Sequence, residues 1–151
     1  MPSAKNAMWT ALKQDAGIIA VVGAKVYPDQ APETNGVITV EEPYLIFQMV
    51  SSVQRVSLSG TLIDLGDYRF QLTGFCATRE QAEDLEAAIL VLLHGDKRGR
   101  GRINQTIGGL HVKASICSQE EGSVDEDEAP RPGEEFGLRV VRIDVRWFTG
   151  A

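Results

Sequence analysis

Few residues of this chain have the types and the spacing that catalysis or metal binding requires. His94 and His111 could join Cys76 or Cys117 on a metal ion, but no interval among the four has the short paired spacing of a zinc site. The sequence contains no Gly-x-Ser-x-Gly nucleophile elbow, and neither cysteine has an evident orienting histidine. We therefore predict no catalytic residue, no cofactor and no bound metal, which makes an enzyme the less favoured class.

The strand positions of the two cysteines also argue against a disulfide. Cys76 alternates with Phe70 and Leu72 on the apolar side of one predicted strand, whereas Cys117 alternates with polar residues such as Lys113 on another. We expect the two thiols to face opposite sides of the sheet and to stay free. Small buried or half-buried side chains are the simplest interpretation of both, because free cysteine often behaves as a small hydrophobic residue.

A glycine-interleaved basic run is the one candidate for phosphate binding. Its cations are Lys97, Arg98, Arg100 and Arg102. Such a run could contact nucleic acid or another partner. However, no aromatic residue is interleaved for base stacking, and cations just beyond a helix C-terminus also complement the helix dipole. Both interpretations stay open, and the sequence favours the solvated turn.

An acidic segment at residues 119–135 accounts for the net negative charge of the chain. Its acids are Glu120, Glu121, Asp125, Glu126, Asp127, Glu128, Glu134 and Glu135. With Arg131 as its one base the segment sums to −7, so the other residues sum to +1 within the formal charge of −6. The segment has no apolar period and does not follow the EF-hand order of ligands. We predict a mobile acidic loop outside the core; lining a channel is the less favoured alternative to keeping the protein in solution.

The stretch from Asp67 to Gly95 predicts the elements that would position any site. Period-two alternation through Tyr68, Phe70, Leu72, Gly74 and Cys76 indicates a strand with one buried face. Thr78 can then cap a helix, with Gln81 completing a capping box. Ala82, Leu85, Ile89 and Leu92 follow at helical spacing, and Gly95 is a natural stop.

The flanking segments predict further helix and strands. Ser3 can cap a first helix whose Trp9, Leu12, Ala16 and Ile19 share one face, with a break around residues 15–17. A polar loop with Pro32, Asn35 and Gly36 leads to a strand over 44–50. Strands are also predicted over 110–118 and 136–148, and in the last of these Val141, Ile143, Val145 and Trp147 face one way.

The sequence predicts a long hairpin arm over residues 51–66. This segment contains more apolar residues than a solvent-exposed arm requires. Its apolar members are Val53, Val56, Leu58, Leu62, Ile63 and Leu65. Side chains of this kind on a projecting arm are candidates for an interface with a subunit or partner.

The fold class predicted from this order is α+β, in one domain over residues 1–151. We expect a single antiparallel or mixed sheet of about four to five strands, two main helices packed on one face, and the long hairpin arm. At 43% apolar residues the chain can form a real core. No apolar run approaches the length of a membrane span and no signal core is evident, so we expect a cytosolic chain with no membrane partner.

Several local strings resemble one known family. They are Val26-Tyr27 after a short helix pair, Pro43-Tyr44-Leu45-Ile46-Phe47, Tyr68-Arg69-Phe70-Gln71-Leu72, Ala82 to Ile89, and Arg146-Trp147-Phe148. In this order they resemble the tail-completion or tail-terminator (head–tail joining) proteins of long-tailed bacteriophages and phage-tail-like particles. The resemblance covers nearly the whole chain, and the acidic segment and the long hairpin differ most from the compact pattern of the family.

The resemblance implies a structural role in the virion. Such proteins cap the head-proximal end of a tail tube as a ring, usually a hexamer, end tube polymerisation and present a surface to the head connector or stopper protein. The implied partners are other copies of the chain, the tail tube protein and that connector, while genome DNA passes through without specific recognition. The implied location is the virion tail, with assembly in the host cytoplasm. Two alternatives remain: another head–tail connector or minor tail protein, and a small cytosolic nucleic-acid-binding domain supported only by the basic run.

Overall fold

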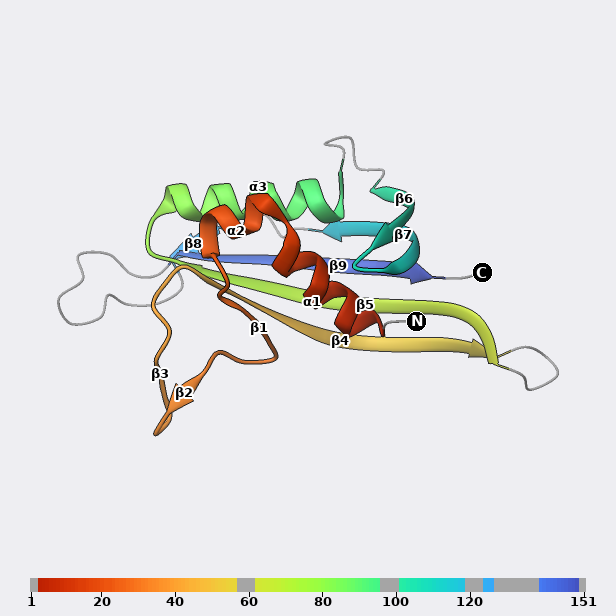
Figure 1. The fold of residues 1–151 in the computed structure, drawn as a ribbon, viewed down its shortest axis with the longest axis horizontal. Coiled ribbons are helices and arrows are strands. Elements are labelled where there is room, and N and C mark those ends of the chain that lie inside the picture. Colours follow the sequence, from red (N-terminus) through yellow and green to blue (C-terminus); the bar gives the residue numbers. More distant parts are fainter. Residues whose placement is uncertain (1–2, 57–61, 96–100, 119–123, 127–138, 150–151) are drawn as a thin grey trace.

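The computed structural model describes residues 3–56, 62–95, 101–118, 124–126 and 139–149, and it has helices on one face of a mixed sheet (Figure 1). The helices are α1 (Ala4–Gln14), α2 (Ala16–Val22) and α3 (Arg79–Leu93). The strands are β1 (Val26–Pro28), β2 (Glu33–Thr34), β3 (Val37–Ile38), β4 (Tyr44–Val56), β5 (Leu62–Cys76), β6 (Arg102–Ile107), β7 (Leu110–Ser118), β8 (Val124–Glu126) and β9 (Arg139–Thr149). None of the helices in these ranges is long and apolar enough to cross a membrane.

The main sheet has seven strands in the described part of the chain. Its order is β1-β4-β5-β9-β7-β6 with β8 beside β9, and β1 runs parallel to β4 while its other pairings are antiparallel. The sequence predicted the α+β class but only four to five strands and two main helices. The added strands β1, β6 and β8 are short and are held by backbone pairing to longer neighbours, so they carry little periodic signal.

The capping predictions are confirmed at both helical regions. Ser3 Oγ accepts a hydrogen bond from Asn6 N at 3.2 Å, and Thr78 Oγ1 accepts one from Gln81 N at 3.2 Å. The predicted break separates α1 from α2 at Asp15, whose carboxylate caps α2 by accepting from Ile18 N at 3.0 Å. These caps satisfy amide groups that a helix start leaves without an intrahelical partner.

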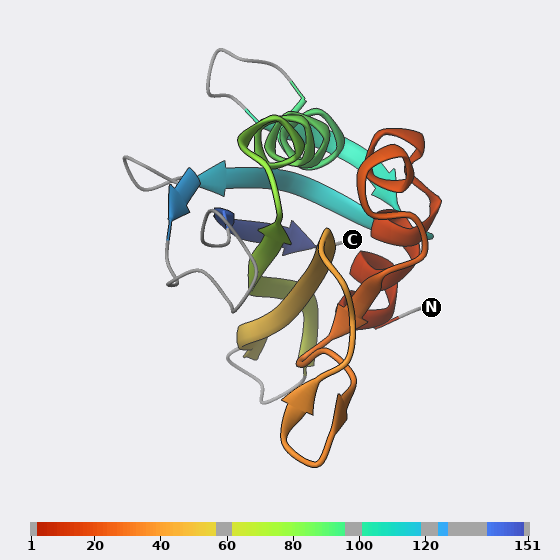
Figure 2. The same ribbon diagram turned by 90° about the vertical axis from the view of Figure 1, so that its left-hand side faces the viewer.

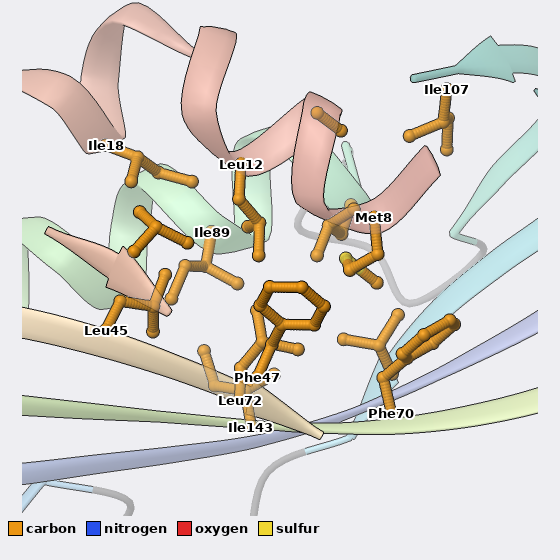
Figure 3. Packing of buried hydrophobic residues seen from close by; sticks show 14 of the residues in the cluster. Met8, Leu12, Ile18, Leu45, Phe47, Phe70, Leu72, Ile89, Ile107 and Ile143 are labelled. Carbon is orange, nitrogen blue, oxygen red and sulfur yellow. The ribbon is translucent and has the colours of Figure 1, made fainter. Parts of the chain in front are cut away.

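The core lies between the helices and one face of the sheet (Figure 3). Leu45, Phe47, Phe70, Leu72 and Ile143 rise from the strands toward the helices, where Met8, Leu12, Ile18 and Ile89 meet them. The predicted apolar side of the last strand is confirmed, since Val141, Ile143, Val145 and Trp147 are all buried. At Gly74 the absence of a side chain lets α3 approach the sheet, because a Cβ there would collide with Leu85.

The buried face predicted for the first helix is wrong in part. Ile19 is 44% exposed and Trp9 is only half-buried, whereas Ala7, Met8 and Ala11 face the core. The break at Asp15 separates two helices, so a helical period cannot be continued from Trp9 to Ile19.

The prediction that Cys76 and Cys117 face opposite sides of the sheet is also wrong. A register shift between Val112 and Ala114 places one extra residue in β7, so Ser115 and Cys117 turn toward the core. A β-bulge of this kind reverses the alternation of side chains beyond it. Both thiols are free and lie on the helix-covered face.

Candidate interaction surfaces

The paired strands β4 and β5 contain the predicted hairpin arm. Their pairing continues from Tyr44 opposite Phe75 to Val56 opposite Leu62, and the pair extends past the helices (Figure 1). Val53, one of the predicted interface residues, is 54% exposed. Leu58 lies outside the described residues, as do the side chains of Val56, Leu62, Ile63 and Leu65.

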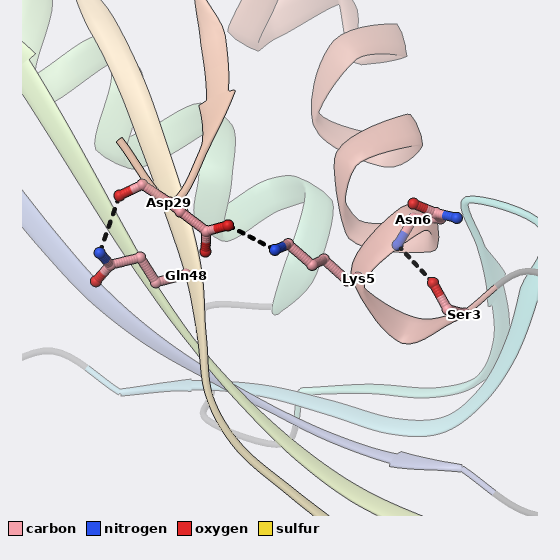
Figure 4. Close-up of polar contacts among 5 residues, drawn as sticks. All are labelled: Ser3, Lys5, Asn6, Asp29 and Gln48. Atoms are coloured by element: carbon pink, nitrogen blue, oxygen red, sulfur yellow. Dashed lines mark hydrogen bonds and ion pairs between the residues drawn. The ribbon is translucent and has the colours of Figure 1, made fainter. Parts of the chain in front are cut away.

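The outer edge of β4 is covered by another strand over only three residues. β1 pairs with Leu45 to Phe47, and then Asp29 ends this pairing by donating its backbone N–H to Phe47 O at 2.9 Å. Gln48 Nε2 donates to Asp29 O at 3.0 Å, and Lys5 Nζ lies 2.6 Å from Asp29 Oδ2 (Figure 4). Beyond Gln48 no described strand pairs with this edge.

A small hairpin projects beside that edge. β2 and β3 pair across Asn35 and Gly36, which have φ values of 53° and 78°, and the hairpin points away from the helices (Figure 2). Val37 is 66% exposed and Ile38 is 38% exposed. The sequence predicted a polar loop here, so these two residues were not among the predicted interface residues. The Asn-Gly pair flanked by β-branched residues is a recognised hairpin signal.

Of the basic run, only Arg102 lies within the described residues. Its guanidinium donates to Val91 O near the C-terminus of α3, with Nη2 at 2.5 Å and Nε at 3.2 Å, and to Gln105 Oε1 at 2.9 Å. The positive charge therefore sits where the helix dipole is negative. Lys97, Arg98 and Arg100 lie outside the described residues.

Three residues of the predicted acidic loop form a strand. Val124, Asp125 and Glu126 make up β8, which pairs with the first residues of β9. The side chains of β8 and the other acids of the segment lie outside the described residues. The loop prediction did not include this strand, which is three residues long and pairs with β9.

The sheet face away from the helices carries charged residues on β5 and β9. Arg69, Arg142, Asp144 and Arg146 alternate with the buried residues of these strands, as the sequence predicted. Arg146 Nη2 lies 2.6 Å from Asp67 Oδ2, and this hydrogen bond raises the pKa of Arg146. The arrangement is an ion pair on a solvated surface, and it resembles no catalytic geometry.

The cysteines and histidines do not form a reactive centre in the described part of the chain. Burial raises the pKa of Cys76 to about 11 and that of Cys117 to about 12, so both are thiols near neutral pH. His94 Nδ1 accepts a hydrogen bond from Cys117 N at 3.1 Å, which is a structural role. No group of three or more potential ligand residues there could hold a metal ion.

A pocket of about 300 Å³ lies between α1, the end of α3, and β6. Two charged residues in its lining, Asp15 and Arg102, are already engaged, the first as the cap of α2 and the second at Val91 O. The pocket therefore lies at a junction of secondary-structure elements, and its lining contains no side chain arranged for catalysis.

Comparison with known proteins places this architecture among virion proteins. The family model described as "Tail completion protein gp17" matches residues 6–109. Among solved structures, a chain from "Virion of native gene transfer agent (GTA) particle" aligns with a TM-score of 0.62 and 16% sequence identity. That alignment covers 99% of this chain and 96% of the other, and it shows a shared fold. The search of curated proteins gave no match.

Proposed function

The chain belongs to the tail completion protein gp17 family, and from this we propose that it caps the head-proximal end of a tail tube as a ring. Family membership makes it a structural protein of a phage-type virion, a class that is typically non-enzymatic. The proposed ring contains six copies, ends tube polymerisation and presents a surface to the head connector or stopper protein.

The match over residues 6–109 is the observation that carries this proposal. It includes the three helices, the strands β4 and β5, and β6. The matched region therefore contains the helical part of the core and the strand pair that extends beyond it. A projecting apolar strand pair supports a role in assembly, because exposed apolar side chains favour contact with another protein.

The proposed partners follow from the position at the tube end. They are neighbouring copies of the chain, the tail tube protein and the head connector, with genome DNA passing through the ring without specific recognition. We place the finished protein in the virion at the head-proximal end of the tail, after assembly in the host cytoplasm. A role as another head–tail connector or minor tail protein remains the nearest alternative.

Negative-stain imaging of the purified chain with and without tail tubes tests the proposal. We expect rings in the chain alone, one ring at one end of each tube, and arrest of further tube growth. Binding along the tube or at its far end would favour a minor tail protein. Salt-sensitive DNA binding by a monomer would instead favour the nucleic-acid-binding alternative.

A further inference from the structure

The exposed large apolar side chains are concentrated at two opposite edges of the main sheet. Within the described residues, Val37, Ile38, Val50 and Val53 lie on the hairpin and β4, which we call the first edge. Val91, Ile103 and Ile116 lie on the end of α3, β6 and β7, which we call the second edge. These edges are at opposite ends of the strand order β1-β4-β5-β9-β7-β6.

Each edge is held in place by its own polar contacts. At the first edge the Lys5–Asp29 pair and the Gln48–Asp29 hydrogen bond tie α1, the end of β1 and β4 together (Figure 4). At the second edge Arg102 fixes β6 to the end of α3 through Val91 O. Both surfaces are therefore preorganised in the free subunit, and preorganisation lowers the entropic cost of binding.

The two edges also differ in charge. Residues 29–56, which include the hairpin and β4, contain four acids and one base, Arg55, and the balance is still −1 after the contacting residues Lys5 and Lys25 are included. Residues 102–113 at the second edge contain two bases, Arg102 and Lys113, and no acid. Opposite charge on the two surfaces favours contact between them over contact of either edge with itself.

Resting on the ring function proposed above, we infer that the first edge of one copy docks on the second edge of the next copy. A closed ring needs a head-to-tail contact between two different surfaces of one subunit. The two edges meet this requirement because they are distinct, lie at opposite ends of the strand order, and are complementary in charge while both are apolar.

Two variants, each blocked at one edge, test this pairing. The first carries Val37→Lys and Val50→Lys, which set positive charge against the basic second edge. The second carries Val91→Glu and Ile103→Glu, which set negative charge against the acidic first edge. All four residues are at least 58% exposed, so we expect both variants to fold. Val53→Lys and Ile116→Glu are substitutes if either fails to fold, and Ile19→Lys, on the exposed side of α2, is the matched control.

Native mass spectrometry gives the readout. We expect rings from the wild type and from Ile19→Lys, monomers from each edge variant alone, and oligomers that contain both variants from an equimolar mixture of the two. In the mixture the unaltered first edge of one variant meets the unaltered second edge of the other, and at the remaining contact the introduced lysines face the introduced glutamates.

Other outcomes would contradict either the pairing of the two edges or the ring function on which it rests. Edge variants that still form rings, or a mixture that stays monomeric, contradict the pairing of these edges while leaving a ring function in place. A variant that dimerises alone shows that an edge binds itself. A wild-type chain that forms no ring, either alone or on tail tubes, overturns the proposed function together with the pairing.

Discussion

Trp147 shows how one side chain joins several elements of this fold. Its indole Nε1 donates to Ser115 Oγ at 2.9 Å, and Ser115 Oγ donates to Leu93 O at 2.5 Å. Its ring also meets Phe70 edge-on, with centroids 5.1 Å apart. One buried residue of β9 thus contacts β5, β7 and, through Ser115, the end of α3.

Replacing this residue should therefore damage the fold severely. We expect Trp147→Ala to lower the free energy of unfolding by about 3–5 kcal/mol, because the change leaves a large cavity in the core. Arg146→Ala, at the neighbouring exposed position, should be mild by comparison. Urea unfolding of both variants measures the difference. Equal losses at the two positions would show that the faces of β9 are wrongly assigned.

The raised pKa values of the two thiols predict a dependence of stability on alkaline pH. Burial raises the pKa of Cys76 from 9.0 to about 11 and that of Cys117 from 9.0 to about 12. Above pH 9 the unfolded chain loses thiol protons that the folded chain retains, so the free energy of unfolding should fall as pH rises from 9 toward 11. Urea unfolding across this window should show a shallower fall for Cys117→Ala than for wild type. Identical slopes would contradict the assignment to the thiols.

At the scale of elements, the strands β4 and β5 are the feature most suited to assembly. They pair over most of their 13 and 15 residues, and their ends pass beyond the region that the helices cover. The core needs only the first part of β4, where Leu45 and Phe47 are buried. The remaining length is therefore available to contact a neighbouring subunit or the tube.

We predict that Leu58→Asp combined with Leu62→Asp leaves the monomer folded and blocks assembly of the ring or its binding to the tube. Burial of apolar side chains of this size at an interface contributes on the order of 1.5–3 kcal/mol each, which two carboxylates would abolish. Circular dichroism checks folding, and negative-stain imaging with tail tubes checks assembly. Normal rings on normal tubes would mean that the arm is not an interface.

At the scale of the whole molecule, charge is distributed very unevenly. The segment at 119–135 has a net charge of −7, while the other residues sum to +1. A sheet protein with exposed apolar edges benefits from such net charge because repulsion between copies limits aggregation. We propose that this is the main role of the segment, and that it lies outside the core.

Replacing residues 123–128 with a short Gly-Ser linker tests this role. The change removes Asp125, Glu126, Asp127 and Glu128, so the formal charge moves from −6 to −2. We expect folding and ring formation to persist, because only the short edge strand β8 is lost and closing a shorter loop costs little. Solubility should fall. Thermal unfolding and sedimentation measure both, and loss of the folded monomer would show that the segment is structural.

The sequence alone was sufficient to predict the features that depend on interactions between residues close together in the chain. Caps at Ser3 and Thr78, the stop at Gly95 and the buried side of β9 each follow from residues close together in the chain, as does the α+β class. Several short sequence segments also resembled the tail completion family, and the family match over residues 6–109 confirms that prediction.

Other features depended on contacts between residues far apart in the sequence. The bulge in β7 that turns Cys117 inward arises from its register with β9, and no alternation within β7 reveals it. β1, β6 and β8 exist because longer neighbours supply their hydrogen bonds. The two apolar edges could be recognised only once the strand order was known, because that order places Val50 on β4 and Ile103 on β6 toward opposite edges of one sheet.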